Sequence, residues 1–350
     1  MVVGLVLAGG YATRLRPTSL STPKHLIPLA NKPVIGYVLE DLAAAGAEEV
    51  HVIVGPHNGD AIREYVGDGS RFGLTARYIV QEKPMGIAHA VSLAEKHISE
   101  DFIAYLGDNL IQGGASRYLS RAKGHDAFLL LKEVEDPSRF GVAVLDSDGK
   151  LTRLVEKPRE PPSKLALMGV YFLTPAFFDY TKRLKPSWRG EYEITDALDL
   201  MMRDGRSVGY AIHEGWWLDV GKKDDVLAAN AVILDENARR EVRGAVENSR
   251  LEGRVLIEEG AVVRNSVVRG PAVIGRGSTI DDSLIGPYTS IGDDCVIRRS
   301  AVEYSVLMEG CAVEGVERIE ESIIGRHARI IASGQRSIKL HVSDYSIVEI

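Results

Sequence analysis

The C-terminal third of the chain contains an internal repeat that few folds can accommodate. Aliphatic residues recur there at steps of five or six positions, and every third one recurs after 17 residues. These positions are Ile257, Val263, Val268, Ile274, Ile280, Ile285, Ile291, Ile297 and Val302. Three short faces per turn, each with one inward aliphatic side chain, describe a prism-shaped parallel β-helix. The repeat predicts about five coils, with glycines such as Gly275 at the tight corners.

The N-terminal part of the chain follows a different pattern, in which short apolar runs alternate with helical segments. The predicted strands are Val2–Leu7, Val50–Val54, Ala76–Val80 and Phe102–Leu106, and the predicted helices are Pro33–Ala45, Gly59–Val66 and Ile87–His97. Such alternation predicts an α/β fold with a mostly parallel sheet and helices on both faces. The pattern is less regular over residues 126–210. A charged helix over residues 224–240 then precedes a domain boundary, which we place near residue 240.

Composition narrows the class of protein. A chain of 350 residues exceeds the usual size of one hydrophobic core, so two domains are expected, residues 1–240 and 241–350. The formal net charge of −7 gives no support for nucleic-acid binding. Neither a membrane-spanning apolar run nor a signal-peptide pattern is present in the sequence. Two cysteines, Cys295 and Cys311, make no disulfide framework and fit buried thiols. These features predict a cytoplasmic protein.

A glycine-containing string, LAGGYATRLRPTSLSTPK, directly follows the first predicted strand. Gly9 and Gly10 open a loop in which backbone N–H groups can face outward, and Arg14, Arg16 and Lys24 add three cations. Backbone donors together with guanidinium and ammonium groups are what a polyphosphate requires. The string matches neither the GxxxxGK[ST] nor the GxGxxG pattern. It therefore predicts a phosphate-binding loop of another kind.

Two aspartates follow apolar runs at distant places in the chain. Asp108 lies in LGDN after one predicted strand, and Asp219 lies in WWLDVG after an apolar and aromatic run. Ligands of parallel sheets bind at the carboxyl ends of the strands, where such side chains meet. Two carboxylates with phosphate oxygens are the usual ligands of protein-bound Mg²⁺, so the pair predicts a magnesium site.

Two further strand ends supply groups for a base and a sugar. Gln81, in QEKPMG, has an amide that can pair with the N3–H and the adjacent carbonyl of thymine or uracil, and Gly86 would allow a flat base to approach. Glu156 and Lys157, in LVEKP, offer an acceptor for sugar hydroxyls and a cation for a phosphate monoester. The histidines, His89 and His341 among them, show no metal-ligand spacing and are interpreted as structural.

These motifs together resemble the sugar-1-phosphate nucleotidylyltransferase family, in its long form with a C-terminal left-handed β-helix. The matching strings are LAGGYATRL, STPKHLIPLANKP, QEKPMGIAHA, LGDN, FGVAVLD, LVEKP, GEYEITDALD and WWLDVGKKDDVLAAN. They cover residues 1 to about 230 in order, and the repeat covers most of the remainder. The resemblance implies a Rossmann-like nucleotidyltransferase domain followed by a left-handed parallel β-helix of hexapeptide-like repeats.

The resemblance also implies an in-line displacement, in which a sugar-1-phosphate oxygen attacks the α-phosphorus of dTTP and pyrophosphate leaves. It implies catalytic roles for Arg14, Lys24 and Lys157, nucleotide binding by Gly9, Gly10, Gln81 and Gly86, sugar binding by Asn109, Gly141 and Glu156, and Mg²⁺ binding by Asp108 and Asp219. Ala12 and Val220 depart from the family pattern, which often has glycine and threonine there, but neither departure removes a charge.

Two alternatives stay open at this point. One is a UTP-dependent N-acetylglucosamine-1-phosphate uridylyltransferase, with or without acetyltransferase activity in the β-helix, since glutamine discriminates poorly between thymine and uracil. The other is a non-catalytic homologue in which the β-helix only assembles subunits. Stacked flat faces offer self-complementary surfaces, so a homo-oligomer with β-helix contacts is expected in either case.

Overall fold

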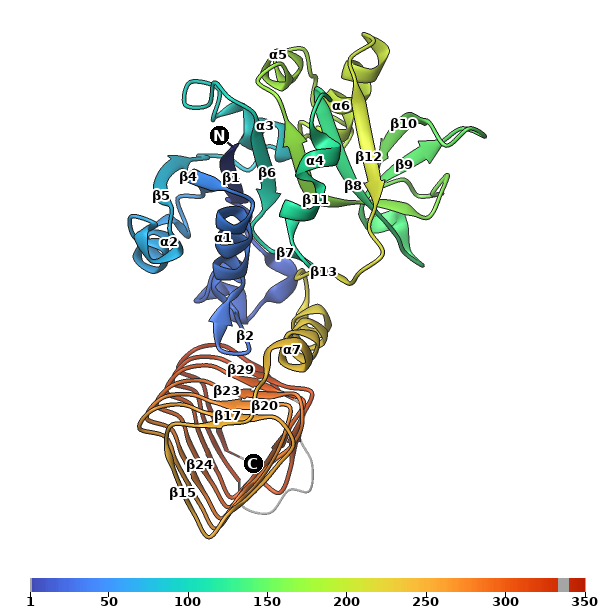
Figure 1. The fold of residues 1–350 in the computed structure, drawn as a ribbon. Coiled ribbons are helices and arrows are strands. Elements are labelled where there is room, and N and C mark those ends of the chain that lie inside the picture. The colour runs from blue at the N-terminus through green and yellow to red at the C-terminus, as the bar shows by residue number, and fades with distance from the viewer. Residues whose placement is uncertain (1, 333–339, 350) are drawn as a thin grey trace. The chain divides into compact units, whose positions relative to one another are not determined.

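The computed structural model describes residues 2–332 and 340–349, and the chain forms two compact units (Figure 1). The first unit comprises Met1–Tyr11 and Ile35–Asp219, and the second comprises Ala12–Val34 and Val220–Ile350. Among the helices in this described part of the chain, none has both the length and the apolar character needed to cross a membrane. We describe each unit by itself.

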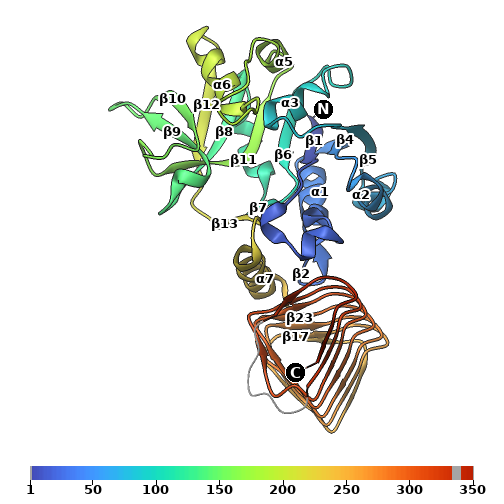
Figure 2. The same ribbon diagram turned by 180° about the vertical axis from the view of Figure 1, so that it is seen from behind.

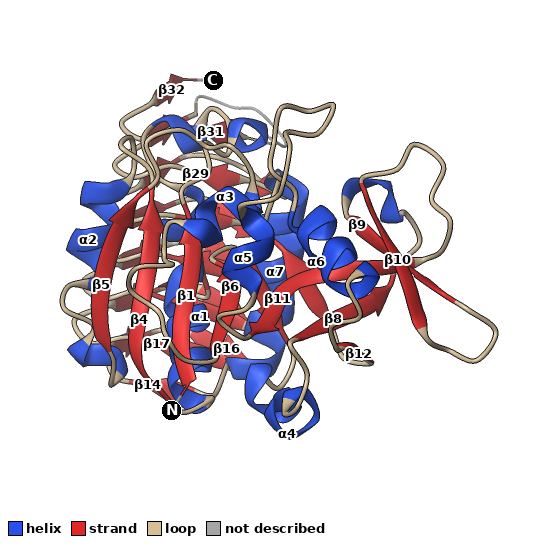
Figure 3. Ribbon diagram, turned by 90° about the horizontal axis from the view of Figure 1, so that it is seen from above, coloured by secondary structure: helices blue, strands red, loops and turns tan. Residues whose placement is uncertain are grey.

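A nine-stranded sheet forms the centre of the first unit, with the order β10-β9-β11-β6-β1-β4-β5 and with β8 joining β11 and β12. Its strands are β1 (Val2–Ala8), β4 (Ala47–Val54), β5 (Thr75–Val80), β6 (Phe102–Leu106), β8 (Ala127–Glu133), β9 (Gly141–Leu145), β10 (Leu151–Glu156), β11 (Leu165–Leu173) and β12 (Val208–Ile212). Strands β6, β1, β4 and β5 run parallel, as predicted (Figure 3). Strands β9, β10 and β11 add antiparallel pairs, in the part of the sequence whose pattern is less regular.

Helices cover both faces of this sheet, which confirms the prediction. Within the described residues, the α-helices of the first unit are α1 (Val34–Ala44), α2 (Gly59–Val66), α3 (Ile87–Ser92), α4 (Leu119–Ala122), α5 (Phe177–Thr181) and α6 (Ile194–Arg203), and α7 (Lys223–Asn237) belongs to the second unit. Leu5 and Leu7 of β1 join a buried cluster with α3, α5 and α6. Gly4 faces the other way, because a Cβ there would lie 3.0 Å from Leu42 of α1. Alternate residues of β1 therefore contact helices on opposite faces.

The predicted helix over Ile87–His97 is wrong in its C-terminal half. Helix α3 ends at Ser92, and the N–H groups of Ala94 and His97 bond to carbonyls three residues back in tight turns. The apolar positions Ala94 and Ile98 still reach the buried cluster. The turns thus keep the apolar face that the sequence pattern shows while ending the regular helix, as 3₁₀-type turns often do.

One carboxyl group of the first unit is buried beside the sheet. Asp41 of α1 accepts hydrogen bonds from the Ala115 N–H (2.8 Å) and from the Tyr105 hydroxyl (3.0 Å). Burial raises the pKa of Asp41 to about 6, against the lowering effect of these two donors. The folded state therefore binds a proton at Asp41 more tightly than the unfolded chain, and this carboxyl stabilises the fold more as the pH falls from about 7 toward 4.

Asp41→Asn is expected to remove this pH dependence from the first unit. In the parent protein, Asp41 alone should add about 1 kcal/mol of stability between pH 7.5 and pH 5. All three tryptophans lie in the first unit, so urea titrations followed by tryptophan fluorescence at both pH values report on it. Asp148→Asn, in an exposed turn, is the matched control. An Asp41→Asn protein with the parent's full pH dependence would contradict the assignment.

The second unit contains the parallel β-helix that the repeat predicted (Figures 1 and 2). One face consists of β14 (Glu241–Val242), β17 (Val255–Ile257), β20 (Ala272–Ile274), β23 (Thr289–Ile291), β26 (Val306–Leu307), β29 (Ile323–Ile324) and β31 (His341–Val342). The second consists of β15 (Ala245–Glu247), β18 (Val262–Arg264), β21 (Thr279–Asp281), β24 (Val296–Arg298), β27 (Ala312–Glu314), β30 (Arg329–Ile331) and β32 (Ile347–Glu349). The third consists of β16 (Arg250–Glu252), β19 (Val267–Arg269), β22 (Leu284–Ile285), β25 (Ala301–Glu303) and β28 (Ile319–Glu320).

The register of the β-helix follows the repeat. Ile257 pairs with Ile274, which pairs with Ile291, and all nine aliphatic positions of the repeat are fully buried. Two faces have seven strands each within the described residues, so the predicted number of about five coils is too low. Cys295 and Cys311 are buried free thiols inside this core, as interpreted from the sequence.

Helix α7 packs against the β-helix, where Leu234 and Ala238 contact Val273 of β20. The β-helix begins at Glu241, next to the predicted boundary at residue 240. Helix α7 and the segment Ala12–Val34 belong to the same compact unit as the β-helix. The division into domains of residues 1–240 and 241–350 stays a prediction.

Candidate functional site

Three loops of the first unit leave the carboxyl edge of the parallel strands. The chain continues from β1 into Gly9, from β5 into Gln81 and from β6 into Gly107. The Gln81 N–H donates to Val54 at the end of β4 (2.8 Å), and the Gly107 N–H donates to Leu7 of β1 (3.0 Å). Because β1, β4, β5 and β6 are parallel, the starts of these three loops lie at the same edge of the sheet.

Asp108 and Asp219 meet around a single amide. A short antiparallel pair, β7 (Asn109–Ile111) with β13 (Trp217–Asp219), places Asp219 opposite Asn109. The Asn109 Nδ2 group donates to Asp108 Oδ1 (3.2 Å) and to Asp219 Oδ1 (3.4 Å), while Asn109 Oδ1 accepts from the Trp217 indole N–H (2.7 Å). Asn109 and Asp108 are buried. The structure thus brings together the two carboxylates that the sequence assigned to a metal.

A cation that the sequence analysis did not identify lies beside this pair. Arg139 Nη2 is 3.8 Å from Asp219 Oδ2, and the Phe140 ring contacts the Trp217 ring with centroids 4.8 Å apart. Residues 2–332 and 340–349 contain no group of three or more His, Cys, Asp or Glu side chains that could hold a metal. Mg²⁺ usually takes one or two protein carboxylates and completes its shell with water and phosphate oxygens. A pair of neighbouring carboxylates, one buried (Asp108) and one half-buried (Asp219), fits that ion in its complex with a nucleoside triphosphate.

Two of the three predicted sugar-binding residues, Gly141 and Glu156, lie on the antiparallel part of the sheet, whereas Asn109 lies on β7. Gly141 of β9 pairs with Glu156 of β10, and a Cβ at Gly141 would lie only 2.7 Å from Thr195 Cγ2. Glycine is therefore required here by the close packing of Thr195 against β9. Glu156 accepts from the Thr195 hydroxyl (3.2 Å) and from Arg189 (3.4 Å). Thr195 and Arg189 are further residues of this site that the sequence analysis missed.

Lys157 follows β10 with an unusual backbone. Its φ angle of 37° is left-handed, and its N–H donates to the Phe140 carbonyl (3.0 Å). Its Nζ lies 3.6 Å from Glu156 Oε1, so the cation and the carboxylate of LVEKP are neighbours. Left-handed backbone at a residue with a long side chain costs free energy and often marks functional sites. The conformation supports, as an independent observation, the choice of Lys157 from the sequence.

Gln81 and its neighbours form a third group. The Gln81 Nε2 group donates to His89 Nδ1 (2.9 Å), which fixes the direction of the amide. Burial lowers the pKa of His89, so this ring is a neutral acceptor at neutral pH. A Cβ at Gly9 would lie 2.8 Å from Gln81 Oε1, whereas a Cβ at Gly10 would meet nothing within 4 Å. His89 thus orients the Gln81 amide that is predicted to recognise the base. The sequence indicated only a structural role for this histidine.

The structure shows why glycine is needed at position 86, which the sequence did not reveal. Its φ is +103°, and a Cβ there would lie 2.5 Å from the Tyr192 carbonyl oxygen. The Tyr192 N–H donates to Met85, and its carbonyl accepts from Ala88. These bonds hold the loop after β5 against the segment that precedes α6. The approach of a base to Gly86 stays a prediction.

The two predicted cations Arg14 and Lys24 belong to the second unit. Arg14 lies in a 3₁₀ turn (Thr13–Leu15) that follows Ala12 in the left-handed conformation (φ 51°), and Lys24 begins another (Lys24–Leu26). A Cβ at Gly221 would lie 3.1 Å from Arg14 Nη2, so the guanidinium lies beside the start of α7. The other predicted site residues belong to the first unit.

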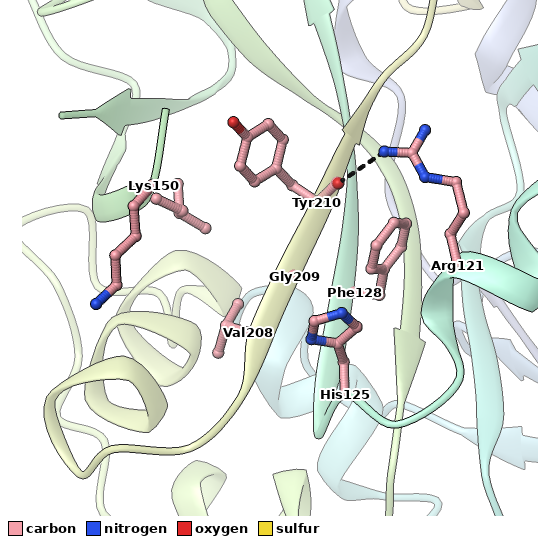
Figure 4. Close-up of a pocket in the computed structure, with 8 residues that line it drawn as sticks. Arg121, His125, Phe128, Lys150, Val208, Gly209 and Tyr210 are labelled. Carbon is pink, nitrogen blue, oxygen red and sulfur yellow. Dashed lines mark hydrogen bonds between the residues drawn. The ribbon is translucent and has the colours of Figure 1, made fainter. Parts of the chain in front are cut away.

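A separate pocket of about 380 Å³ opens beside β8 and β12 in the first unit (Figure 4). Its lining residues are Arg121, His125, Phe128, Lys150, Leu151, Val208, Gly209 and Tyr210. Arg121 donates to the Tyr210 carbonyl, and the Lys150 ammonium group points away from the other labelled side chains. These eight residues include none of the predicted site residues, so the pocket is not the candidate site.

Comparison with models of known protein families identifies the family of this chain. Residues 3–236 match the model of the nucleotidyl transferase family. The chain belongs to this family. Residues 229–303 match a second model, described as the GlmU-like C-terminal hexapeptide, so the β-helix after the nucleotidyl transferase part is of the hexapeptide type. Both assignments agree with the resemblance seen in the motifs.

Several relatives share the fold of this nucleotidyl transferase. Two proteins named glucose-1-phosphate thymidylyltransferase, from Streptomyces antibioticus and Streptomyces griseus, are 46% and 45% identical to this chain, and each alignment covers 99% of both chains. A solved structure, a candidate glucose-1-phosphate thymidylyltransferase from Bacillus anthracis in complex with a sucrose, is 35% identical with a TM-score of 0.62. It covers 66% of this chain and 95% of that one.

Proposed function

We propose that the chain transfers a thymidylyl group from dTTP to glucose-1-phosphate, giving dTDP-glucose and pyrophosphate. The observation that supports this most directly is the pair Asp108 and Asp219, whose carboxylates both accept hydrogen bonds from the Asn109 amide. The Streptomyces relatives, aligned over nearly the whole of both chains, bear the name of this reaction.

The reaction is an in-line displacement at the α-phosphorus of dTTP. A phosphate oxygen of the sugar attacks, and the bond to the leaving pyrophosphate breaks, so the enzyme contributes positioning and charge neutralisation. Lys157 holds the attacking phosphate, while Arg14 and Lys24 neutralise the triphosphate. The Arg14 guanidinium lies beside Gly221, which follows Asp219 by only two residues in the chain.

Asp108 and Asp219 are the residues that would hold Mg²⁺. The ion, when bound with dTTP, supplies Lewis-acid neutralisation of the phosphate oxygens. The chain's own contribution is orientation: both Nδ2 hydrogens of Asn109 bond to carboxylate oxygens, and its Oδ1 accepts from Trp217. These bonds fix the Asn109 side chain. The family resemblance also implies that Asn109 binds the sugar, but we propose that it acts mainly on the carboxylates.

Gln81 reads the base in this proposal. Its amide can accept from the N3–H of thymine or uracil and donate to the neighbouring carbonyl. His89 stabilises one amide direction through the 2.9 Å hydrogen bond, and Gly9 leaves room for the Oε1 atom. Gly9 and Gly10 offer backbone donors to the triphosphate, and Gly86 keeps the loop after β5 in place.

Gln81→Glu is expected to raise the KM for dTTP by about tenfold or more and to change kcat less. A carboxylate can no longer donate to a base carbonyl, and the cost of a lost donor in a site built for it is of this size. Steady-state kinetics with varied dTTP measures the effect. Glu82→Gln, at the exposed neighbouring position, is the control. An unchanged KM would contradict base recognition by Gln81.

The sugar would lie beside Gly141 and Glu156. A Cβ at Gly141 would lie 2.7 Å from Thr195 Cγ2 and 3.3 Å from Glu156 Oε2, so glycine allows β9 to pack against both side chains. Arg189 donates to Glu156 Oε1 and the Thr195 hydroxyl donates to Glu156 Oε2, so both carboxylate oxygens are held. Such a fixed acceptor strengthens hydrogen bonds to hydroxyl groups while the phosphate is bound by Lys157.

A second candidate is a UTP-dependent N-acetylglucosamine-1-phosphate uridylyltransferase, with or without acetyl transfer by the β-helix. The match of residues 229–303 to the GlmU-like hexapeptide model favours it. A coupled pyrophosphate-release assay over dTTP, UTP and GTP with both sugar phosphates, together with an acetyl-CoA assay, separates the candidates. Fastest turnover with dTTP and glucose-1-phosphate supports our proposal, faster turnover with UTP and the amino sugar supports the alternative, and no turnover supports a non-catalytic assembly protein.

Two further parts of the proposal concern the whole protein. We propose a cytoplasmic location, in keeping with nucleotide and sugar-phosphate substrates. We also propose that the chain forms a homo-oligomer through β-helix contacts, because stacked flat faces are self-complementary. Light scattering at several concentrations, on the full chain and with its β-helix faces substituted, tests the second point.

A further inference from the structure

The cation segment, residues 13–26, is bonded to the last coil of the β-helix. Thr18 and Thr22 of this segment are fully buried. The Thr22 hydroxyl donates to Asp344 Oδ2 (3.1 Å), and His341 Nε2 shares a hydrogen bond with the Thr18 hydroxyl (2.8 Å). All of these residues belong to the second unit. Buried hydroxyl groups with fixed partners restrict the backbone on which they lie.

Asp344 links the segment to the coil below it. Its Oδ1 atom accepts from the Arg326 N–H (2.8 Å), and its Oδ2 atom accepts from Thr22. Next to it, the Ser343 and Ser21 hydroxyl groups lie 2.9 Å apart. The carboxylate therefore bonds one coil of the β-helix on one side and the cation segment on the other. Hydrogen bonds to a charged acceptor are among the stronger ones in proteins.

A second set of bonds holds the chain just beyond the cation segment, at Ala30 and Asn31. The Asn230 side chain of α7 accepts from the Ala30 N–H (2.9 Å) and from the Ser290 hydroxyl of β23 (2.7 Å). Asn31 Nδ2 donates to the Ile291 carbonyl (2.6 Å). Lys24 lies between Thr22, which bonds to Asp344, and Ala30, which bonds to Asn230. The backbone around Lys24 is thus fixed on both sides by the β-helix and α7.

We propose that Asp344 and its neighbours in the last coil are positioning residues for Lys24. The β-helix then acts in nucleotidyl transfer as well as in assembly, because it holds the cation where the triphosphate is neutralised. Thr22 is only two residues from Lys24, and a displacement of about 1 Å in a charged group can cost about 100-fold in rate. The inference rests on the proposed role of Lys24 in the proposed function.

The test uses the full chain with Thr22→Val and Asp344→Asn, singly and together. Each single variant is expected to lower kcat with dTTP and glucose-1-phosphate by about tenfold, with a smaller change in KM. The double variant should lose no more than either single variant, since both remove one shared hydrogen bond. Asp281→Asn, whose side chain lies near Arg264 and Arg298 in the middle coils, is the matched control and should keep the parent rate.

Transfer of the same variants into a Lys24→Ala background distinguishes positioning from a general structural effect. If Asp344 acts through Lys24, Asp344→Asn should have no further effect on kcat there. An equal loss in both backgrounds overturns the proposal, and so do parent-like rates for Thr22→Val and Asp344→Asn. A parent protein without pyrophosphate release overturns the proposed function itself. Thr22→Val leaves the β-helix intact, so it decides the matter where Asp344→Asn disturbs the last coil.

Discussion

Asparagine in place of either Asp108 or Asp219 is expected to slow nucleotidyl transfer by about 10²- to 10³-fold. Each substitution removes one negative charge from the pair that would hold Mg²⁺ on the triphosphate, while the side chain keeps its size. The Asn109 amide donates hydrogen bonds to both carboxylates in the parent protein. The single carboxylate that remains in each variant should hold the ion poorly. Initial rates of pyrophosphate release at saturating substrates, with Mg²⁺ varied, measure the loss.

The dependence on Mg²⁺ separates this explanation from a disturbance of the fold. Both variants should need more Mg²⁺ for half-maximal rate, and their loss should be partly relieved at high concentration. Asp148→Asn, the same change in an exposed turn, should behave as the parent protein. The idea fails if Asp108→Asn and Asp219→Asn keep the parent's rate and Mg²⁺ dependence. Since the two carboxylates act together, the double variant should be little slower than the worse single one.

The β-helix could be predicted almost completely because each coil is determined by local, repeated constraints. One inward aliphatic residue per face must be buried, and the coil below fixes its partner, so the sequence interval gives the register directly. The predicted equivalence of Val268, Ile285 and Val302 is therefore the observed pairing. The number of coils was underestimated because the aliphatic spacing becomes less regular after Glu309, although the strands continue.

The carboxylate pair could be predicted only in part. The end of β6 gave Asp108 its position, because five consecutive apolar residues are a strong strand signal. Strands β7 and β13 contain three residues each and lie more than one hundred residues apart in the chain, too short for a pattern to reveal their pairing. This pairing is what brings Asp219 to Asn109. Tertiary contacts decide such short strands, so the sequence could indicate a meeting of the aspartates but not the amide between them.

The arginines of the site gave no sequence signal, and Thr195 gave only its place in the string GEYEITDALD, without a role. Arg139, Arg189 and Thr195 each act through a contact with a distant carboxylate. The bonds from Thr18 and Thr22 to the last coil are equally invisible, since they join residues more than 300 positions apart. Sequence patterns report local periodicity and strand ends, whereas these contacts depend on how loops pack.

Arg14→Ala is expected to lower kcat by about 10²- to 10³-fold, the second of the two largest effects. The guanidinium is proposed to neutralise charge that moves toward pyrophosphate in the transition state, and the loss of one such group has a cost of this order. Arg14→Lys should recover part of the rate, because the charge remains while the forked pair of donors is lost. Arg276→Ala, an exposed arginine at a corner of the β-helix, is the matched control.

Chemical rescue gives the sharper test of this role. Added guanidinium ion should raise the rate of Arg14→Ala by severalfold and leave Arg14→Lys nearly unchanged, since only the alanine variant has space for the ion. Ala12 precedes Arg14 in a left-handed conformation, and the 3₁₀ turn after it fixes the direction of the arginine backbone. Ala12→Gly should therefore loosen this turn and lower kcat modestly. It should not change the response of the Arg14→Ala protein to added guanidinium ion. Arg14→Ala at more than a third of the parent rate would show that the leaving group is neutralised by other cations.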